Sequence, residues 1–128
     1  MKIVISSLLR IGDFLMHQNV RNGIKEIFPE AEFTWILQDS NSPMHELLPE
    51  GDQCVLFPRR SLQEMAKLRS LPIGAPEVVM HEWLSHLTSV KFDWALNLGH
   101  DKTSGYILSQ VQADRKTGLE WDGKSWKS

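Results

Sequence analysis

The stretch KIVISSLLRIGDFLMHQNVRNGIKEIFP, residues 2–29, predicts a buried β-strand that leads directly into an amphipathic helix. Residues 2–6 are mostly β-branched and are apolar on both faces, as in a strand that lies inside a parallel sheet. Over residues 13–28 the apolar side chains recur at steps of three and four, which is the spacing of one helix face. The helix is expected to end at Phe28, because the proline that follows disfavours the α conformation there and supplies no amide.

The alternation of strand and helix continues along the chain. Further strands are predicted at 32–37, 53–57 and 93–98, with a fifth at 116–119, and further helices at 61–69, 77–90 and 103–112, with a turn at 39–43 that leads into a short helix ending at Leu48. Such alternation implies right-handed crossovers. We therefore expect an α/β fold with a Rossmann-like open parallel sheet of four to five strands and helices on both faces. Residues 1–120 are expected to form this domain, and residues 121–128 a tail or an interdomain linker.

Composition narrows the class of protein. With 128 residues, 41% hydrophobic and 23% charged, the chain has the size and composition of one globular domain. Its net charge of -2 and isoelectric point near 6.2 argue against nucleic acid as a partner, because nucleic acids are usually bound by a strongly basic face. The single cysteine, Cys54, excludes an intramolecular disulfide and lies in an apolar run that predicts a core position. Neither a signal peptide nor an apolar run of roughly 20 residues is visible, so we expect a cytoplasmic protein and leave association with the inner face of the inner membrane open.

The segment after the first strand bears most directly on ligand binding, because open α/β sheets bind ligands at the carboxyl ends of their strands. It has neither of the glycine-rich loops that cradle phosphates, but places Gly12 and Asp13 at the start of the helix. A helix N-terminus favours an anion, and an ionised Asp13 would already occupy that place and repel a diphosphate. The alternative interpretation is that Asp13 is an ordinary helix N-cap.

Two other strand ends are polar. Arg59 and Arg60 follow the third strand and could bind a small anion, although adjacent cations are more often solvated surface. The segment after the fourth strand could form hydrogen bonds to a polyol through Gly99, His100, Lys102 and Ser104. The alternative is a plain turn with Thr103 or Ser104 as a helix cap. The five histidines show no metal-binding spacing.

Three short motifs carry a family resemblance. Residues 1–29 resemble the N-terminus of glycosyltransferase family 9, the heptosyltransferase group, through a strand, Arg-Ile-Gly-Asp at 10–13 and a helix that closes in Phe-Pro. Residues 93–100, followed by Ser104, are similar to the family's aspartate-containing strand with a polar, glycine-containing loop, and 115–118 to its closing basic-basic-x-Gly element. The motifs occur in the family's order over almost the whole chain.

The resemblance implies the N-terminal, acceptor-side half of a GT-B enzyme, in which two Rossmann-like domains face each other across a cleft. Asp13 matches the aspartate that acts as general base, which takes the proton from an acceptor hydroxyl while the anomeric carbon is inverted. Arg59 and Arg60 would then face phosphate or carboxylate groups of a lipopolysaccharide-core acceptor. The other expected substrate-binding residues are Arg10, Gly12, Gly99, His100, Lys102 and Ser104.

The nucleotide-sugar donor is expected on a C-terminal domain that these 128 residues do not include. The chain alone is therefore expected to have no transferase activity, and no resident cofactor or metal is expected. The expected partners are a glycan or glycolipid acceptor and the donor-binding domain, with peripheral membrane association as an open expectation. Trp121 and Trp126 are candidates for the face that packs on that domain, or for a contact in a homodimer.

The sequence departs from the family pattern at two places. The family has small polar residues and a proline after Gly-Asp, whereas here the helix continues through residues 16–20, and Asn97 stands where an aspartate is common. The alternative function is a non-catalytic Rossmann-like binding or interaction module that has kept the fold without the transferase partner. A small flavodoxin-like nucleotide or flavin binder is disfavoured, because Asp13 stands where such a protein needs a phosphate cradle.

Overall fold

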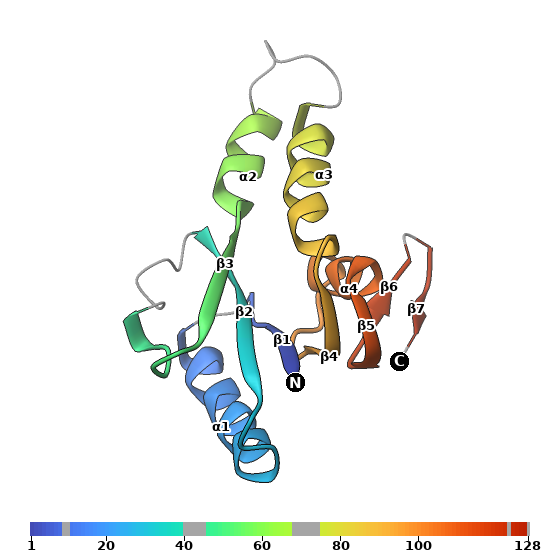
Figure 1. Ribbon diagram of the computed structural model, residues 1–128. Helices are drawn as coiled ribbons and strands as arrows, with labels where there is room; N and C mark the ends of the chain where they lie inside the picture. The colour runs from blue at the N-terminus through green and yellow to red at the C-terminus, as the bar shows by residue number, and fades with distance from the viewer. Residues whose placement is uncertain (9–10, 40–45, 68–74, 123, 128) are drawn as a thin grey trace.

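The computed structural model describes residues 1–8, 11–39, 46–67, 75–122 and 124–127, which form a five-stranded parallel sheet with helices and a separate two-stranded hairpin (Figure 1). In chain order the elements are β1 (Lys2–Ser6), α1 (Ile11–Ile27), β2 (Glu32–Gln38), β3 (Gln53–Phe57), α2 (Arg59–Lys67), α3 (Ala75–Thr88), β4 (Lys91–Asn97), α4 (Lys102–Gln110), β5 (Gln112–Thr117), β6 (Glu120–Trp121) and β7 (Trp126–Lys127). The order of strands in the large sheet is β3-β2-β1-β4-β5. The expected Rossmann-like open parallel sheet is confirmed.

β1 lies at the centre of the sheet, where it pairs with β2 on one side and β4 on the other. Its residues 3–6 are all buried, because both faces of the strand are covered. The apolar pattern on both faces is what such a position requires. The order of strands reverses between β1 and β4, and this reversal is the switch point at which open α/β sheets bind their ligands.

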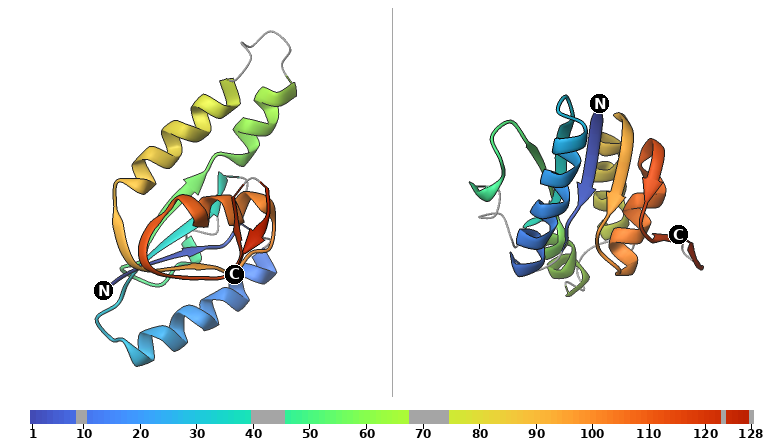
Figure 2. Two further views of the ribbon diagram at one scale, coloured as in Figure 1. Left: turned by 90° about the vertical axis from the view of Figure 1, so that its right-hand side faces the viewer. Right: turned by 90° about the horizontal axis from the view of Figure 1, so that it is seen from below.

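α1 covers one face of the sheet (Figure 2). Phe14 meets Trp35 of β2 edge to face, with ring centroids 5.2 Å apart. The helix ends at Ile27, immediately before Phe28 and Pro29, as the proline predicts. The core on this face contains Ile3, Ile5, Phe14, Ile24, Ala31, Phe33, Trp35, Leu37 and Leu96.

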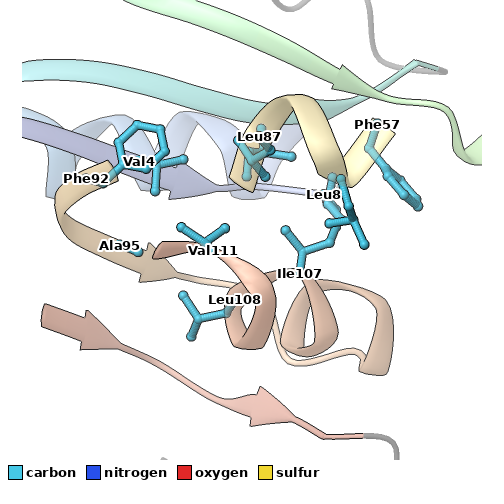
Figure 3. Close-up of a cluster of buried hydrophobic side chains, with 11 residues drawn as sticks. Val4, Leu8, Phe57, Leu87, Phe92, Ala95, Ile107, Leu108 and Val111 are labelled. Carbon is cyan, nitrogen blue, oxygen red and sulfur yellow. The ribbon is translucent and has the colours of Figure 1, made fainter. Parts of the chain in front are cut away.

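α3 and α4 pack on the opposite face, so helices cover both faces as expected (Figure 2). Figure 3 shows the core on this side, in which Ile107 and Leu108 of α4 lie over Ala95 of β4. The labelled members of the cluster are Val4, Leu8, Phe57, Leu87, Phe92, Ala95, Ile107, Leu108 and Val111. α2 and α3 lie side by side and extend beyond the sheet at the end of β3 (Figure 1).

A buried ion pair fastens α1 to the strands beneath it. Arg21 donates from Nε and Nη2 to the two carboxylate oxygens of Asp52, at 2.9 and 2.7 Å. Trp35 donates its indole N–H to the same carboxylate at 2.9 Å. The guanidinium also lies 4.7 Å from the centroid of the Phe33 ring. The side chains of Arg21 and Asp52 are only 10% and 3% exposed, so water contributes little to their solvation.

Several predicted boundaries were wrong by a few residues. The fifth strand is β5 at residues 112–117 rather than 116–119, and α4 ends at Gln110 rather than at 112. β5 is an edge strand of polar composition, QADRKT, and therefore carries little of the hydrophobic alternation that marks a strand in sequence. α2 begins two residues earlier than predicted. Parts of four predicted segments lie outside the described residues: 40–43 of the predicted turn, the start of the short helix before Leu48, the last residues of the 61–69 helix and most of the loop at 71–76.

The C-terminal segment, which carries no clear pattern of apolar residues, forms a small antiparallel hairpin of β6 and β7. The rings of Trp121 and Trp126 face each other with centroids 5.1 Å apart. The hairpin packs against α4 at Gly105, where an added Cβ would come within 2.9 Å of the Trp126 ring. The tryptophans therefore form part of the folded domain, and a linker role for 121–128 stays a prediction.

Candidate functional site

The candidate site is the carboxyl edge of the sheet at the switch point between β1 and β4. The two strand ends are joined there, since the amide of Leu98 donates to the carbonyl of Ser6 at 3.3 Å. On the other side of β1, the amide of Ser7 donates to the carbonyl of Ile36 at 2.9 Å. Ser7 is thus held as an extension of the strand.

Asp13 lies in the first turn of α1, the helix that follows β1, and is half-buried. Because α1 begins at Ile11, Asp13 lies inside the helix, and the alternative interpretation of Asp13 as the N-cap is wrong. Within the described part of the chain, no hydrogen bond or ion pair engages its carboxylate. Gly12 is exposed, and an added Cβ there would meet nothing within 4 Å. Arg10 lies outside the described residues.

Sequence reasoning missed two residues next to Asp13. The Ser7 hydroxyl oxygen lies 2.7 Å from Nδ1 of His17, and Ser7 is 1% exposed. Burial lowers the pKa of His17, and the negative charge of Asp13 offsets part of that effect. A histidine four residues after an aspartate in a helix signals such proximity, but the serine partner comes from the strand and has no signal in sequence.

A second group of site residues joins α2 to α4. Nη2 of Arg59 lies 2.7 Å from Oδ2 of Asp101, so this arginine is engaged in an ion pair and belongs to α2 rather than to a loop. Asp101 is the N-cap of α4 and accepts from the amide of Ser104 at 3.1 Å, which corrects the expectation of Thr103 or Ser104 as the cap. Burial alone would raise the pKa of Asp101, but hydrogen bonds from Ser104 and Arg59 and the charge of Arg59 outweigh it and lower the pKa.

Gly99 and Ser104 shape the loop between β4 and α4. Ser104 is 0% exposed, and its hydroxyl donates to the carbonyl of Asp101 at 3.1 Å. The amide of Gly99 donates to Oδ1 of Asn97 at 2.9 Å, and an added Cβ at Gly99 would come within 2.9 Å of the Ser104 hydroxyl oxygen. Nδ2 of Asn97 donates to the carbonyl of Leu119 at 2.9 Å. These contacts give Gly99 and Ser104 a packing role in the chain as it stands.

The remaining predicted site residues are exposed. His100 and Arg60 lie at the surface, and the amide of Arg60 donates to Oδ1 of Asp39 at 2.9 Å. The ammonium of Lys102 lies 4.5 Å from the centroid of the Trp121 ring, so Lys102 points to the C-terminal hairpin. The structure therefore brings Arg59, Gly99 and Ser104 together, whereas Lys102 lies along the side of α4 that faces the hairpin.

Two polar atoms at this edge are buried without a partner. Within the described chain, Oγ of Ser6 and Oε1 of Gln38 have no hydrogen bond. Ser6 ends β1 and pairs with Ile36, and Gln38 ends β2 two residues further on, so both side chains lie on the α3/α4 face of the sheet. Such unpaired groups are uncommon, because buried polar groups are almost always hydrogen-bonded.

Two cavities lie elsewhere on the surface, and neither is lined by Asp13. One of about 660 Å³ lies between α2, α3, α4 and β6, with Lys102 and Trp121 in its wall. The other, of about 460 Å³, lies at the amino edge of the sheet and includes Lys2 and His86. In the described residues there is no group of three or more His, Cys, Asp or Glu side chains suited to a metal ion, and no helix with the length and apolarity to cross a membrane.

Comparison with solved structures gives the same fold in glycosyltransferases. The chain superposes on Escherichia coli heptosyltransferase WaaC with ADP-2-deoxy-2-fluoro heptose at a TM-score of 0.73 and 10% identity, over 91% of this chain and 36% of that one. WaaC with ADP gives a TM-score of 0.72 at 10% identity, over 91% and 35% of the two chains. A family 9 glycosyltransferase from Veillonella parvula gives 0.72 at 16% identity, over 94% and 32%.

The chain has the fold of one Rossmann-like part of these glycosyltransferases. It spans about a third of their length. The sequence itself matches no model of a known protein family and no curated protein. The expected likeness to heptosyltransferases and family 9 is confirmed at the level of structure.

Proposed function

We propose that this chain is the acceptor-binding N-terminal domain of an inverting GT-B glycosyltransferase. The observation that carries the proposal is the place of Asp13, a half-buried carboxylate at the first turn after the central strand, beside the switch point. The likeness in fold to heptosyltransferases supports sugar transfer as the class of reaction, with a heptose-like sugar passing from a nucleotide-sugar to a lipopolysaccharide-core-type acceptor.

In this proposal Asp13 is the general base. It takes the proton of an acceptor hydroxyl as that oxygen attacks the anomeric carbon from the side opposite the diphosphate. The new glycosidic C–O bond forms as the bond to the diphosphate breaks, the diphosphate leaves with the electron pair, and the configuration is inverted. A carboxylate that lacks a described partner can take up a proton without first breaking an ion pair.

The acceptor would be held by polar groups along the same edge. In this proposal the surface residues Arg60, His100 and Lys102 contact acidic groups of the core. Three other residues contribute to acceptor binding indirectly in this proposal. Arg59 acts through its ion pair with Asp101, whereas Gly99 and Ser104 set the shape of the loop between β4 and α4. Gly12 lies in the first turn of α1, immediately before Asp13, and Arg10 keeps its proposed role by its place in the sequence.

The donor nucleotide-sugar is assigned to a second, C-terminal domain outside these 128 residues. Asp13 at the start of α1 would repel a diphosphate on this domain, which supports placing the donor elsewhere. The chain alone is then inactive. Together with the donor-binding domain it acts at the inner face of the inner membrane in this proposal. A homodimer of the chain and peripheral membrane association are part of the same proposal.

Acceptor binding is tested by adding a lipopolysaccharide inner-core oligosaccharide to the ¹⁵N-labelled chain and following the amide resonances. We expect Ser7, Asp13, Gly99 and Ser104 to shift. Lys2 and the other residues of the amino-edge cavity are the internal control and should stay in place. Asp13→Asn should bind the oligosaccharide as well as wild type does, because a general base contributes to turnover more than to ground-state binding.

Three results would each count against a part of the proposal. No shift at the carboxyl edge with the oligosaccharide at millimolar concentration would favour the alternative, a non-catalytic module with the same fold. Micromolar binding of ADP to this chain would contradict the argument from the charge of Asp13. Sugar transfer by the chain from ADP-heptose to the oligosaccharide would refute the separate claim that it is inactive alone.

A further inference from the structure

The cavity between α2, α3, α4 and β6 shares only Lys102 with the proposed acceptor site. α2 and α3 lie side by side and α4 contacts α3, so three helices frame the cavity (Figure 1). Its volume of about 660 Å³ is within the roughly 300–1,000 Å³ of small-molecule sites. The residues that line it are Phe57, Leu62, Met80, His81, Leu84, Lys102, Thr103, Tyr106 and Trp121.

The C-terminal hairpin completes one wall of this cavity. β6 packs on α4 at Gly105, where an added Cβ would come within 3.0 Å of the Trp121 Cβ. The absence of a side chain at Gly105 therefore lets Trp121 approach the helix. The ammonium of Lys102 lies 4.5 Å from the centroid of the Trp121 ring, so the lysine and the tryptophan are held together at this end of the cavity.

The charge of the lining favours an anion. His81 and Lys102 are basic, and none of the nine lining residues carries a carboxylate. In the part of the chain that the structure describes, Lys102 contacts the Trp121 ring and forms no ion pair. The carboxylate of Asp101, the preceding residue, is bound to Arg59 at 2.7 Å and caps α4, so its charge is already neutralised. An anion beside Lys102 would thus meet a cation without a competing carboxylate.

The other end of the cavity is aliphatic. α2 and α3 contribute Leu62, Met80 and Leu84, so apolar side chains of two helices lie next to the cationic end. Such a lining suits a ligand with a hydrocarbon chain and one anionic group.

Two larger partners fit this cavity less well. Nine residues line it, whereas a stable protein–protein interface uses roughly 20–30 residues a side. One lysine and one histidine are also too few to dock the cavity on an anionic bilayer, which takes clusters of about four to eight Lys or Arg.

We propose that this cavity binds a monomeric fatty carboxylate, with the head group at Lys102 and the chain between α2 and α3. The proposal goes beyond glycosyl transfer and does not depend on it, because the other lining residues have no role in the proposed acceptor site.

The test is an NMR titration of the whole chain, labelled with ¹³C at the methionine methyls and ¹⁵N at the indoles, with sodium decanoate below its micelle-forming concentration. The Met80 methyl and the Trp121 indole should shift, with a dissociation constant of about 1 mM or lower. Met16 is the internal control, since it is 67% exposed on α1 and reports adsorption to any apolar surface. Acetate supplies the head group without the chain and should shift neither resonance.

A second amphiphile and two variants test the role of charge. Decyltrimethylammonium, with the same chain and the opposite charge, should bind at least about fivefold more weakly than decanoate. Lys102→Gln should weaken decanoate binding by roughly three- to fivefold, as for an exposed charge pair. Lys2→Gln removes a cation from the amino-edge cavity and is the matched control, which should bind decanoate as wild type does.

Three outcomes would each overturn the proposal: equal affinities for the two amphiphiles, a Met16 shift as large as that of Met80, or no Met80 shift at millimolar decanoate. None of these measurements involves a glycan, so their outcome is independent of the oligosaccharide experiment.

Discussion

Replacement of Asp52 by alanine should be among the most destabilising single changes in this chain. The substitution removes both hydrogen bonds from Arg21 and the acceptor of the Trp35 indole N–H. The guanidinium would remain beneath α1, with its side chain only 10% exposed and without a counter-ion. Breaking a buried pair by removing one partner costs roughly 3–5 kcal/mol, because the other charge stays desolvated.

The assay is urea unfolding followed by tryptophan fluorescence and far-UV circular dichroism. With a urea m-value of about 2 kcal/mol/M, a loss of roughly 4 kcal/mol lowers the midpoint by about 2 M. Asp52→Asn should lose less, because the amide oxygen still accepts one of the hydrogen bonds. The control is Asp114→Ala, which breaks the Lys91–Asp114 pair, whose side chains are 68% and 64% exposed, and should change stability by less than about 1 kcal/mol. If Asp52→Ala costs no more than Asp114→Ala, the argument from burial is wrong.

Three further predictions follow from individual contacts. Gly118→Ala should destabilise the chain by more than about 2 kcal/mol, because φ is 113° and a Cβ would lie 2.3 Å from the Asn97 carbonyl oxygen. The control is Gly12→Ala, which has open space around the added Cβ and should cost under about 1 kcal/mol. Thermal melts of both variants measure the difference. Gly105→Ala should detach the β6–β7 hairpin and red-shift tryptophan emission while the circular dichroism of the sheet persists; unchanged emission would contradict the packing. Since the folded-state pKa of Asp101 is lowered, its contribution to stability is present above the ordinary aspartate pKa near 4 and is lost as pH falls below it, so Asp101→Asn should flatten the acid limb of a stability–pH curve.

Local rules predicted most of the fold. The two-sided apolar pattern of residues 2–6 can be buried only in a central strand, and the proline at 29 ends α1 wherever the helix packs. The alternation of strands and helices then leaves a parallel sheet with right-handed crossovers as the main solution. The edge strand β5 was placed several residues too late and the C-terminal hairpin was not predicted, because their stability comes from β4 and α4 rather than from their own polar sequences.

The candidate site divides in the same way. Residue order along the chain is enough to predict a carboxylate at the start of α1 after a buried strand, since both features depend on neighbouring residues. The bond between Ser7 and His17, the pairing of Arg59 with Asp101 forty-two positions away, and the approach of Lys102 to Trp121 follow from the folded arrangement alone. Such pairs form because distant segments are brought to one edge of a sheet, and an ion pair or hydrogen bond across that edge leaves no periodic trace in the sequence.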